Sequence, residues 1–130
     1  MTDDTGSLRR VVSAYDQVWQ DLDVEAILAH YHYPCMVLTP EGVAIRNDAE
    51  QLRPAITGAV AAMEASEYSH SEIAEVSCKQ LSDALALVSQ YAVRFDAAGD
   101  PIGEGVTTYT FSKTDGEWKI AVLMPQRPIH

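Results

Sequence analysis

The feature that most constrains the fold is an Asp-Gly pair near the end of the chain, Asp115-Gly116. This pair supplies the two residues of positive φ that a type I′ hairpin turn requires. β-branched and aromatic residues flank it on both sides, throughout residues 106–122. The sequence therefore predicts two β-strands joined by a tight turn as the last unit of the fold.

Apolar residues near the start of the chain follow helical spacing. One continuous stripe predicts an amphipathic helix of about four turns and consists of Leu8, Val11, Val12, Tyr15, Val18, Trp19 and Leu22. Thr5 or Ser7 can cap this helix, because a hydroxyl oxygen can accept a hydrogen bond from a free amide of the first turn. Asp23 can cap a second, short helix with an inner face of Ala26, Ile27 and Tyr31. Pro34 excludes a helical continuation through Tyr33.

A third helix is predicted after a short hairpin. Residues 35–39 and 42–46 indicate two strands around a Pro-Glu-Gly turn. Asn47, with Glu50 three residues later, resembles a capping box and opens the helix. The apolar stripe of this helix is Leu52, Ile56, Val60 and Met63. Pro54 lies within the stripe and lacks a backbone donor, so we expect a kink or a broken first turn.

The chain changes to a strand pattern at residue 68. Within residues 68–80, Ile73 and Val76 fall on opposite faces of a strict two-residue period, which predicts a β-bulge near Ala74-Glu75. Residues 84–95 alternate between two faces, one with Leu85, Leu87, Tyr91, Val93 and Phe95 and the other with Val88, Gln90 and Arg94. The element order ααββαββββ predicts an α+β domain, with helices packed on one face of a curved, mostly antiparallel sheet.

Length and charge limit the class of protein. The chain of 130 residues predicts one domain, residues 1–130, with an ordered core of about residues 7–124. A formal net charge of −10 argues against nucleic acid and membranes as partners, since both present negative charge. No apolar run approaches the ~20 residues of a membrane span, and the acidic N-terminus does not resemble a signal peptide. Cys35 and Cys78 lack C-x-x-C spacing, so we expect reduced thiols in a cytoplasmic protein, while a disulfide between them stays open.

Three segments together carry a family resemblance. They are residues 14–28 (Ala-Tyr-Asp-Gln-Val-Trp-Gln-Asp-Leu-Asp-Val-Glu-Ala-Ile-Leu), the strand that ends at Thr39-Pro40, and the closing Asp-Gly-x-Trp-Lys-Ile. Over roughly residues 8–124 the chain resembles the NTF2-like superfamily, which includes ketosteroid isomerase, SnoaL-like polyketide cyclases, scytalone dehydratase and limonene epoxide hydrolase. The resemblance implies a cone-shaped domain with a pocket between helices and sheet, and a homodimer packed through the sheets. It does not imply one reaction, because this fold hosts many chemistries.

The resemblance also implies site residues that can be compared position by position. Ketosteroid isomerase has a general-base aspartate before the proline that follows the first strand, and Thr39 stands there. Its oxyanion-binding acid is matched by about Thr107, and the tyrosine of its first helix is matched by Tyr15. A threonine cannot act as a base near neutral pH, so we expect no ketosteroid isomerase activity. Arg94 resembles part of the Asp-Arg-Asp relay of limonene epoxide hydrolase, but no pair of strand aspartates accompanies it.

The predicted site combines two candidates for acid–base chemistry with a set of ligand-binding residues. His70, on the first long strand, and Tyr15 are the catalytic candidates. The ligand-binding candidates are Trp19, Tyr31, Met36, Thr39, Met63, Arg94 and Tyr109. Each has a structural alternative. His70 can lie exposed at a sheet edge, Arg94 can pair with a carboxylate on the outside, and Tyr15 and Trp19 can belong to the core.

The densest group of chemically active side chains is His30-Tyr31-His32-Tyr33. A His-x-His pair on a strand could bind a metal, with His70 as a third ligand. We favour the alternative that these residues lie at a helix C-terminus, where a protonated histidine meets the free carbonyl groups. The sequence therefore predicts neither a metal nor a cofactor.

Two kinds of function fit these features. The first is an enzyme or carrier for a small, largely apolar molecule, with cofactor-independent acid–base chemistry of the lyase, isomerase or hydrolase type if it is catalytic. The second is a non-catalytic module that binds a ligand or assembles with a protein. The aromatic and methionine side chains expected around the pocket favour the first. Their filling of that space would favour the second.

Overall fold

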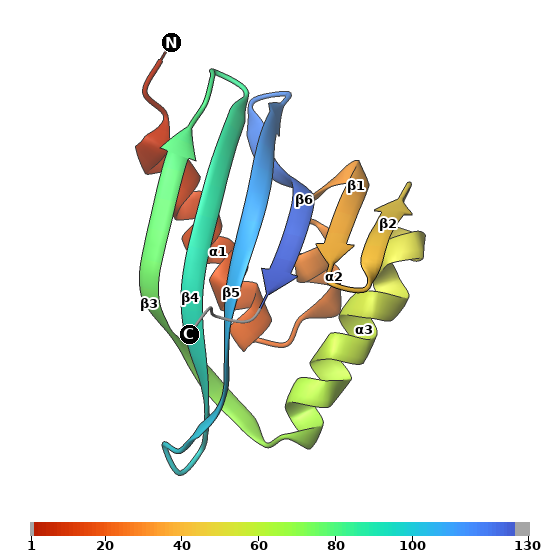
Figure 1. Ribbon diagram of the computed structural model, residues 1–130, viewed down its shortest axis with the longest axis vertical. Helices are drawn as coiled ribbons and strands as arrows, with labels where there is room; N and C mark the ends of the chain where they lie inside the picture. Colours follow the sequence, from red (N-terminus) through yellow and green to blue (C-terminus); the bar gives the residue numbers. More distant parts are fainter. Residues whose placement is uncertain (1, 127–130) are drawn as a thin grey trace.

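Three helices pack on one face of a six-stranded sheet, in a computed structural model that describes residues 2–126 (Figure 1). The helices are α1 (Thr5–Gln20), α2 (Val24–Leu28) and α3 (Ala49–Ala65). The strands are β1 (Tyr31–Thr39), β2 (Gly42–Arg46), β3 (Tyr68–Gln80), β4 (Leu85–Asp96), β5 (Pro101–Thr114) and β6 (Glu117–Gln126). This order confirms the predicted α+β class and the predicted succession of elements.

The sheet has the strand order β2-β1-β6-β5-β4-β3. All neighbouring strands are antiparallel except β1 and β6, which are parallel. The closing hairpin is confirmed, because Thr114 pairs with Glu117 and both Asp115 and Gly116 have positive φ. The bulge in β3 is confirmed as well. Ile73 pairs with Ala92 and Glu75 with Tyr91, so one extra residue lies between two consecutive pairs.

The start of α1 differs from the prediction of a Thr5 or Ser7 cap, which is wrong. Asp4 occupies the cap position, and its side chain makes no capping hydrogen bond. Its carboxylate instead accepts hydrogen bonds from Lys113 Nζ at 2.6 Å and from Trp118 Nε1 at 2.9 Å. These bonds tie the first turn of α1 to the hairpin of β5 and β6, which are more than a hundred residues away in the chain.

The short second helix ends earlier than predicted. Asp23 caps it as expected, by accepting a hydrogen bond from the Ala26 amide at 3.1 Å. Tyr31, which we expected on its inner face, is instead the first residue of β1, so that prediction is wrong. The cause is tertiary: Tyr31 pairs with Ile120 of β6, and the Ile120 amide donates to the His30 carbonyl at 2.9 Å. A free strand edge thus competes with continuation of the helix.

Helix α3 begins one residue later than the predicted capping box. Asp48, not Asn47, is the cap, and its carboxylate accepts from the Gln51 amide at 2.9 Å. The Gln51 side chain accepts in return from the Asn47 amide at 2.8 Å. The predicted broken first turn at Pro54 is wrong, because α3 runs through this residue, while the alternative of a kink stays a prediction. Pro54 lies near the helix start, so its missing donor costs only the bond to the Glu50 carbonyl, while the apolar stripe beyond it stays buried.

The two faces of the sheet differ in what covers them. We call the face that packs against the helices the inner face; it contributes Val88, Phe111 and Ile120 to the core. On the opposite, outer face, one row of paired residues crosses five strands and consists of Leu87, Thr110, Val122, Met36 and Ile45. Ile45 is 57% exposed and Leu87 37% exposed, so the outer face presents apolar side chains that the described residues leave open.

Candidate functional site

A cluster of three buried tyrosines occupies the centre of the inner face. Tyr15 of α1 packs edge to face against Tyr31 and Tyr109, with ring centroids 5.9 and 5.6 Å apart. The hydroxyl groups of Tyr15 and Tyr31 share a hydrogen bond of 2.6 Å. Burial raises the pKa of all three phenols well above the ordinary value. The cluster therefore stays neutral and fills the part of the cone where the sequence predicted open space.

A carboxyl group borders this cluster. Asp16 of α1 faces the sheet, and its Oδ1 accepts a hydrogen bond of 2.6 Å from Gln90 Nε2 of β4. Burial raises the pKa of Asp16 to about 6, and the bond from Gln90 opposes this rise only in part. Gln90 is itself only 6% exposed, and its Oε1 finds no hydrogen-bond partner among residues 2–126. An acid that titrates close to neutral pH is suited to proton transfer.

Further polar groups lie on the same face, toward the end of β4. Arg94 pairs with Ser71 of β3, and both share the face of Gln90 because two-residue steps along a strand return to the same side. The Tyr68 hydroxyl and Ser71 Oγ are 2.7 Å apart. Burial raises the pKa of Tyr68, while the charge of Arg94 lowers it and the charge of Asp16 raises it. Tyr68 therefore lies within electrostatic reach of both charged groups.

His70 does not join this set. It pairs with Phe95, and the two rings stack at 5.2 Å with an interplanar angle of 13°. Because adjacent residues of a strand point to opposite faces, His70 and Phe95 lie on the side opposite to Ser71 and Arg94. The structure thus separates the two polar residues that we expected to enter one pocket. The catalytic role predicted for His70 stays a prediction, and its position offers no contact with Tyr15 or Asp16.

The other predicted ligand residues are dispersed. Trp19 is half-buried beside Tyr15, with ring centroids 6.5 Å apart, and Met63 is half-buried on α3. Met36 belongs to the apolar row of the outer face, away from the tyrosines. Thr39 lies at the end of β1, where its Oγ1 accepts from the Glu41 amide at 3.3 Å. The inner-face set therefore retains Tyr15, Trp19, Tyr31, Tyr109 and Arg94 from the sequence prediction.

The histidine cluster also differs from our interpretation. His32 and its two tyrosine neighbours lie in β1 and not at a helix end. Burial lowers the pKa of His30, which disfavours the protonated form expected there. Lys119 instead donates to the Ala29 carbonyl at 2.6 Å, at the end of α2. Within residues 2–126, no group of three or more His, Cys, Asp or Glu side chains is arranged to hold a metal ion.

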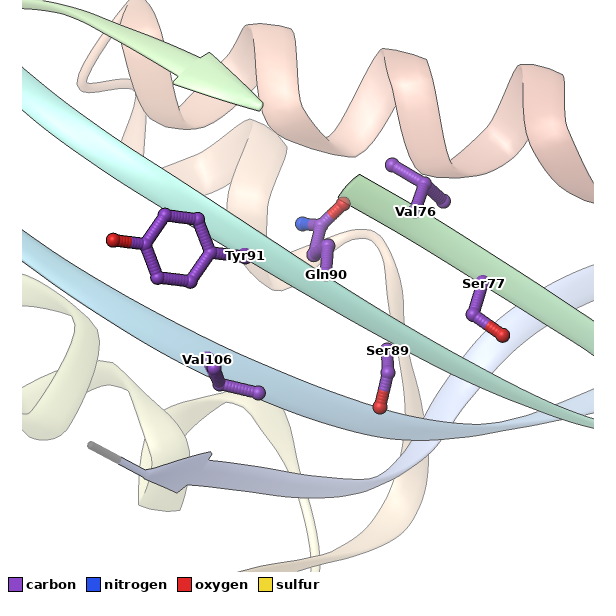
Figure 2. A pocket seen from close by; sticks show the side chains of 6 residues that line it. All are labelled: Val76, Ser77, Ser89, Gln90, Tyr91 and Val106. Carbon is purple, nitrogen blue, oxygen red and sulfur yellow. The ribbon is translucent and has the colours of Figure 1, made fainter. Parts of the chain in front are cut away.

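Two hollows on the surface lie outside the predicted pocket. The larger, of about 460 Å³, is lined by Val76, Ser77, Ser89, Gln90, Tyr91 and Val106 (Figure 2). Figure 2 shows Gln90 directed toward α1, whereas Ser77 and Ser89 point to the other side of the sheet. The second, of about 360 Å³, is lined by Ser7, Val11, Ala29, His30, Gly116, Glu117, Trp118 and Lys119. Neither hollow contains Asp16 or Arg94.

Sequence reasoning missed Asp16, although a signal was available. Gln90 was placed on the same strand face as Val88, and a buried amide requires a polar partner from the covering helix. Asp16 follows Tyr15 directly in the sequence, beside the apolar stripe, and is the acidic residue in position to supply that partner.

Cys35 and Cys78, the two cysteines of the chain, are free thiols, the first buried and the second half-buried. Among the described residues no helix is long and apolar enough to cross a membrane.

Solved structures share this architecture at low sequence identity. An NTF2-like protein of unknown function from Pseudomonas putida superposes with a TM-score of 0.76 at 13% identity, over 96% of this chain and 87% of the other. An NTF2-like protein of unknown function from Shewanella oneidensis gives 0.73 at 18% identity, over 95% and 98%. A ketosteroid isomerase-like protein from Erwinia carotovora gives 0.72 at 16% identity, over the whole of both chains.

These likenesses show the fold alone, since none of the three identities reaches a fifth. No curated protein matches the chain in sequence. A family model described as NTF2-like protein (DUF6841) matches residues 4–128, which is almost the entire chain. The hairpin, the inserted helix between strands and the helix-covered inner face agree with that assignment. The chain belongs to this family of NTF2-like proteins.

Proposed function

We propose that the inner face binds a small, largely apolar molecule and transfers a proton on it without a cofactor, with Asp16 as the acid–base group. The observation that carries this proposal is the placement of Asp16, a half-buried carboxyl on the inner face that Gln90 holds through one oxygen; burial there raises its pKa to about 6. A carboxyl group in water titrates near 4, where it is a weak base at neutral pH. A base with a pKa closer to the working pH holds an abstracted proton better.

The contacts of Asp16 suit this role. Gln90 holds one carboxylate oxygen, and the second oxygen accepts no hydrogen bond from residues 2–126. That free oxygen is the one able to take a proton from carbon. Gln90 can also adapt to a protonated Asp16, since rotation of its amide by half a turn would present the unpaired Oε1 as an acceptor. Tyr68 supplies a neutral hydroxyl donor on the same face.

The proposed step is proton abstraction next to a carbonyl. The C–H bond breaks, its proton moves to Asp16, and the electron pair moves into the carbonyl to form an enolate oxygen. A hydroxyl or amide donor beside that oxygen would stabilise the charge. Return of a proton from Asp16 to the same or another carbon completes an exchange or an isomerisation. The aromatic side chains around Asp16 suit an apolar substrate body.

Deuterium exchange tests the proposal without knowledge of the natural substrate. Cyclohexanone and phenylacetone are incubated with the protein in D2O near neutral pH, and proton NMR measures loss of the signals beside the carbonyl. Exchange above the buffer rate should disappear in Asp16→Asn and persist in Asp21→Asn, a change in an exposed residue at the end of the same helix. Exchange equal to buffer for both ketones, or equal in the two variants, would contradict acid–base chemistry by Asp16.

A non-catalytic role in assembly is the second candidate. The tyrosine cluster fills the centre of the inner face, and the apolar row of the outer face is left open by the described residues. We propose that this outer face packs against a second copy of the chain, because an uncovered apolar sheet face is typical of an interface. The two free thiols support a cytoplasmic location, where thiols stay reduced.

Light scattering tests this assembly. The protein should show about twice the 14.2 kDa mass of the chain. Leu87→Glu, within the apolar row, should return the mass to that of one chain, because a charge would be buried without a partner. Leu81→Glu is a matched control, since Leu81 is 47% exposed but lies between β3 and β4, outside the row. A monomer at all concentrations would contradict the proposal.

A further inference from the structure

We propose that Arg94 binds the carboxylate of an elongated organic acid whose opposite end reaches Asp16. This inference goes beyond the proposed function: it concerns a ligand bound on the same face, and it does not require that ligand to be the substrate of the proton transfer. It starts from a cation without a partner. Arg94 is half-buried, and it forms no hydrogen bond or ion pair with residues 2–126, in a chain that has 19 acidic residues against 9 basic ones.

The position of the guanidinium depends on a glycine. Arg94 pairs with Gly103 of β5, and its side chain lies across that residue. A Cβ atom added at Gly103 would stand 2.5 Å from Nη2 of Arg94, closer than real atoms approach. The absence of a side chain at this position is therefore what allows the guanidinium to lie flat on the inner face of the sheet. A planar guanidinium with free N–H groups is the side chain best suited to hold a carboxylate by two parallel hydrogen bonds.

The sheet between Arg94 and Gln90 carries small residues. Ala92 of β4 points to the same face, and its partner across the strand pair is Gly105 of β5. Gly103 lies beneath the guanidinium and extends this set of small residues, which we call the floor. No large side chain from these two strands rises between the arginine at one end and the Asp16–Gln90 pair at the other. These two strands therefore present a shallow surface in this stretch, along which the proposed ligand would lie.

Tyr68 lies within electrostatic reach of both ends of this stretch, Arg94 and Asp16. The pKa of its phenol responds to the positive charge of Arg94 and to the negative charge of Asp16, in opposite directions. Its hydroxyl is bonded to Ser71 Oγ, on the residue paired with Arg94. Tyr68 therefore stands at the side of the floor and can offer a further hydrogen bond to a bound molecule.

The strand geometry limits the length of the ligand. Gln90 and Arg94 are four residues apart, which corresponds to about 13 Å along a strand. This is the span between the two backbone positions, and the Arg94 side chain and the two hydrogen bonds take up part of it, so the ligand is shorter than this span. The donor must be a hydroxyl or an N–H, since Asp16 in its ionised form only accepts. The ligand class is thus an aryl or alicyclic acid with a hydroxyl group at the far end.

The probe for this class is 4-hydroxyphenylacetate, followed by NMR titration of the labelled protein. Phenylacetate lacks the donor, and 4-hydroxyphenylacetamide lacks the charge. We expect the hydroxy acid to bind more tightly than both, and Arg94→Gln to weaken its binding about 10–100-fold, as expected for loss of a charge-assisted pair. Lys79→Gln is the matched control, because it removes one positive charge from an exposed position of β3. It should leave the affinity unchanged.

A second variant moves the guanidinium and keeps its charge. Gly103→Ala places a methyl group where Nη2 of Arg94 lies, and the flexible end of the arginine has to shift. We expect this variant to weaken the hydroxy acid several-fold and to reduce the preference over the amide. Since the contact is with the far end of a flexible side chain, the variant should still fold.

Several outcomes would overturn the inference. They are absence of binding at millimolar concentration, equal affinity for acid and amide, unchanged affinity in Arg94→Gln, or signal changes confined to the outer face. Ketone exchange that depends on Asp16 with no acid binding through Arg94 would refute this inference alone. Acid binding through Arg94 without any such exchange would refute the proposed chemistry and retain the carboxylate site.

Discussion

Replacement of Asp16 by asparagine should stabilise the folded protein at neutral pH and leave its stability nearly unchanged in acid. Burial raises the pKa of this carboxyl from 3.8 to about 6. A carboxyl group whose pKa is higher in the folded than in the unfolded state stabilises the folded protein fully at pH values below its unfolded-state pKa. That contribution is lost as the pH rises through its folded-state pKa. Above about pH 6 the wild-type protein therefore carries a carboxylate that its surroundings disfavour.

The size of the effect follows from the shift. A rise of about 2 pKa units corresponds to roughly 3 kcal/mol at 1.36 kcal/mol per unit. Asp16 is half-buried, so solvent screens part of this cost and we expect a gain of about 1–2 kcal/mol in Asp16→Asn. The asparagine side chain keeps the shape of the carboxylate, and its oxygen can still accept from Gln90. No hydrogen bond has to be lost.

Urea denaturation at a series of pH values measures this difference. The free energy of unfolding of Asp16→Asn minus that of wild type should be near zero at about pH 4 and rise to its plateau by about pH 7. Asp21→Asn, at the exposed end of α1, should show no such rise. A difference that stays constant with pH, or a loss of stability above pH 6, would refute the placement of a buried, ionisable Asp16 under the tyrosine cluster.

Three other measurements test the structure. Trp19→Ala should cost about 1–3 kcal/mol by urea denaturation, less than a fully packed ring, because Trp19 is only half-buried. No ketosteroid isomerase activity is expected with an unsaturated 3-ketosteroid, since the resemblance matches its two carboxyl positions to Thr39 and about Thr107; turnover that Thr39→Ala abolishes would contradict the comparison. Asp4→Asn should lower the thermal midpoint above about pH 4 and have no effect in stronger acid, because the bond from Lys113 lowers the pKa of Asp4.

The elements that local sequence determines were predicted well. The Asp-Gly turn requires positive φ at both residues and leaves few alternatives, and the chain adopts it. The bulge in β3 followed from two apolar residues that had to reach the same core from opposite phases of a strand. Both are cases in which backbone geometry and side-chain burial point to one answer.

Elements that depend on distant partners were predicted less well. Tyr31 continues the apolar pattern of α2, yet pairing with Ile120 of β6 recruits it to β1. Asp4 is a good cap by composition, but Lys113 and Trp118 occupy its carboxylate. In each case a group from the other end of the chain offers a stronger contact than the local one, and no window of neighbouring residues contains that information.

The site residues show the same limit. The helical stripe located Tyr15 and Trp19 correctly under the sheet, because burial of one helix face is a local pattern. Asp16 was overlooked, since a lone acid beside such a stripe is usually solvated. The strand phase of β4 placed Arg94 with Gln90, but the bulge in β3 and the irregular pairing near its start determine the phase of His70. Strand phase beyond a bulge cannot be counted from sequence alone.

Burial of the Asp16 carboxylate lowers the stability of the folded protein, and this is the physical reason for placing function on the inner face. The larger surface hollow offers hydroxyl groups, but Ser89 already shares a hydrogen bond of 2.6 Å with Thr108, and the described residues that line this hollow carry no charge. The inner face instead holds a carboxyl with a raised pKa, and along one side of β4 it holds an amide oxygen and a guanidinium that find no partner among residues 2–126. Apolar residues of similar size would make this region more stable. Polar groups that oppose folding in this way are characteristic of sites that bind or transform a molecule.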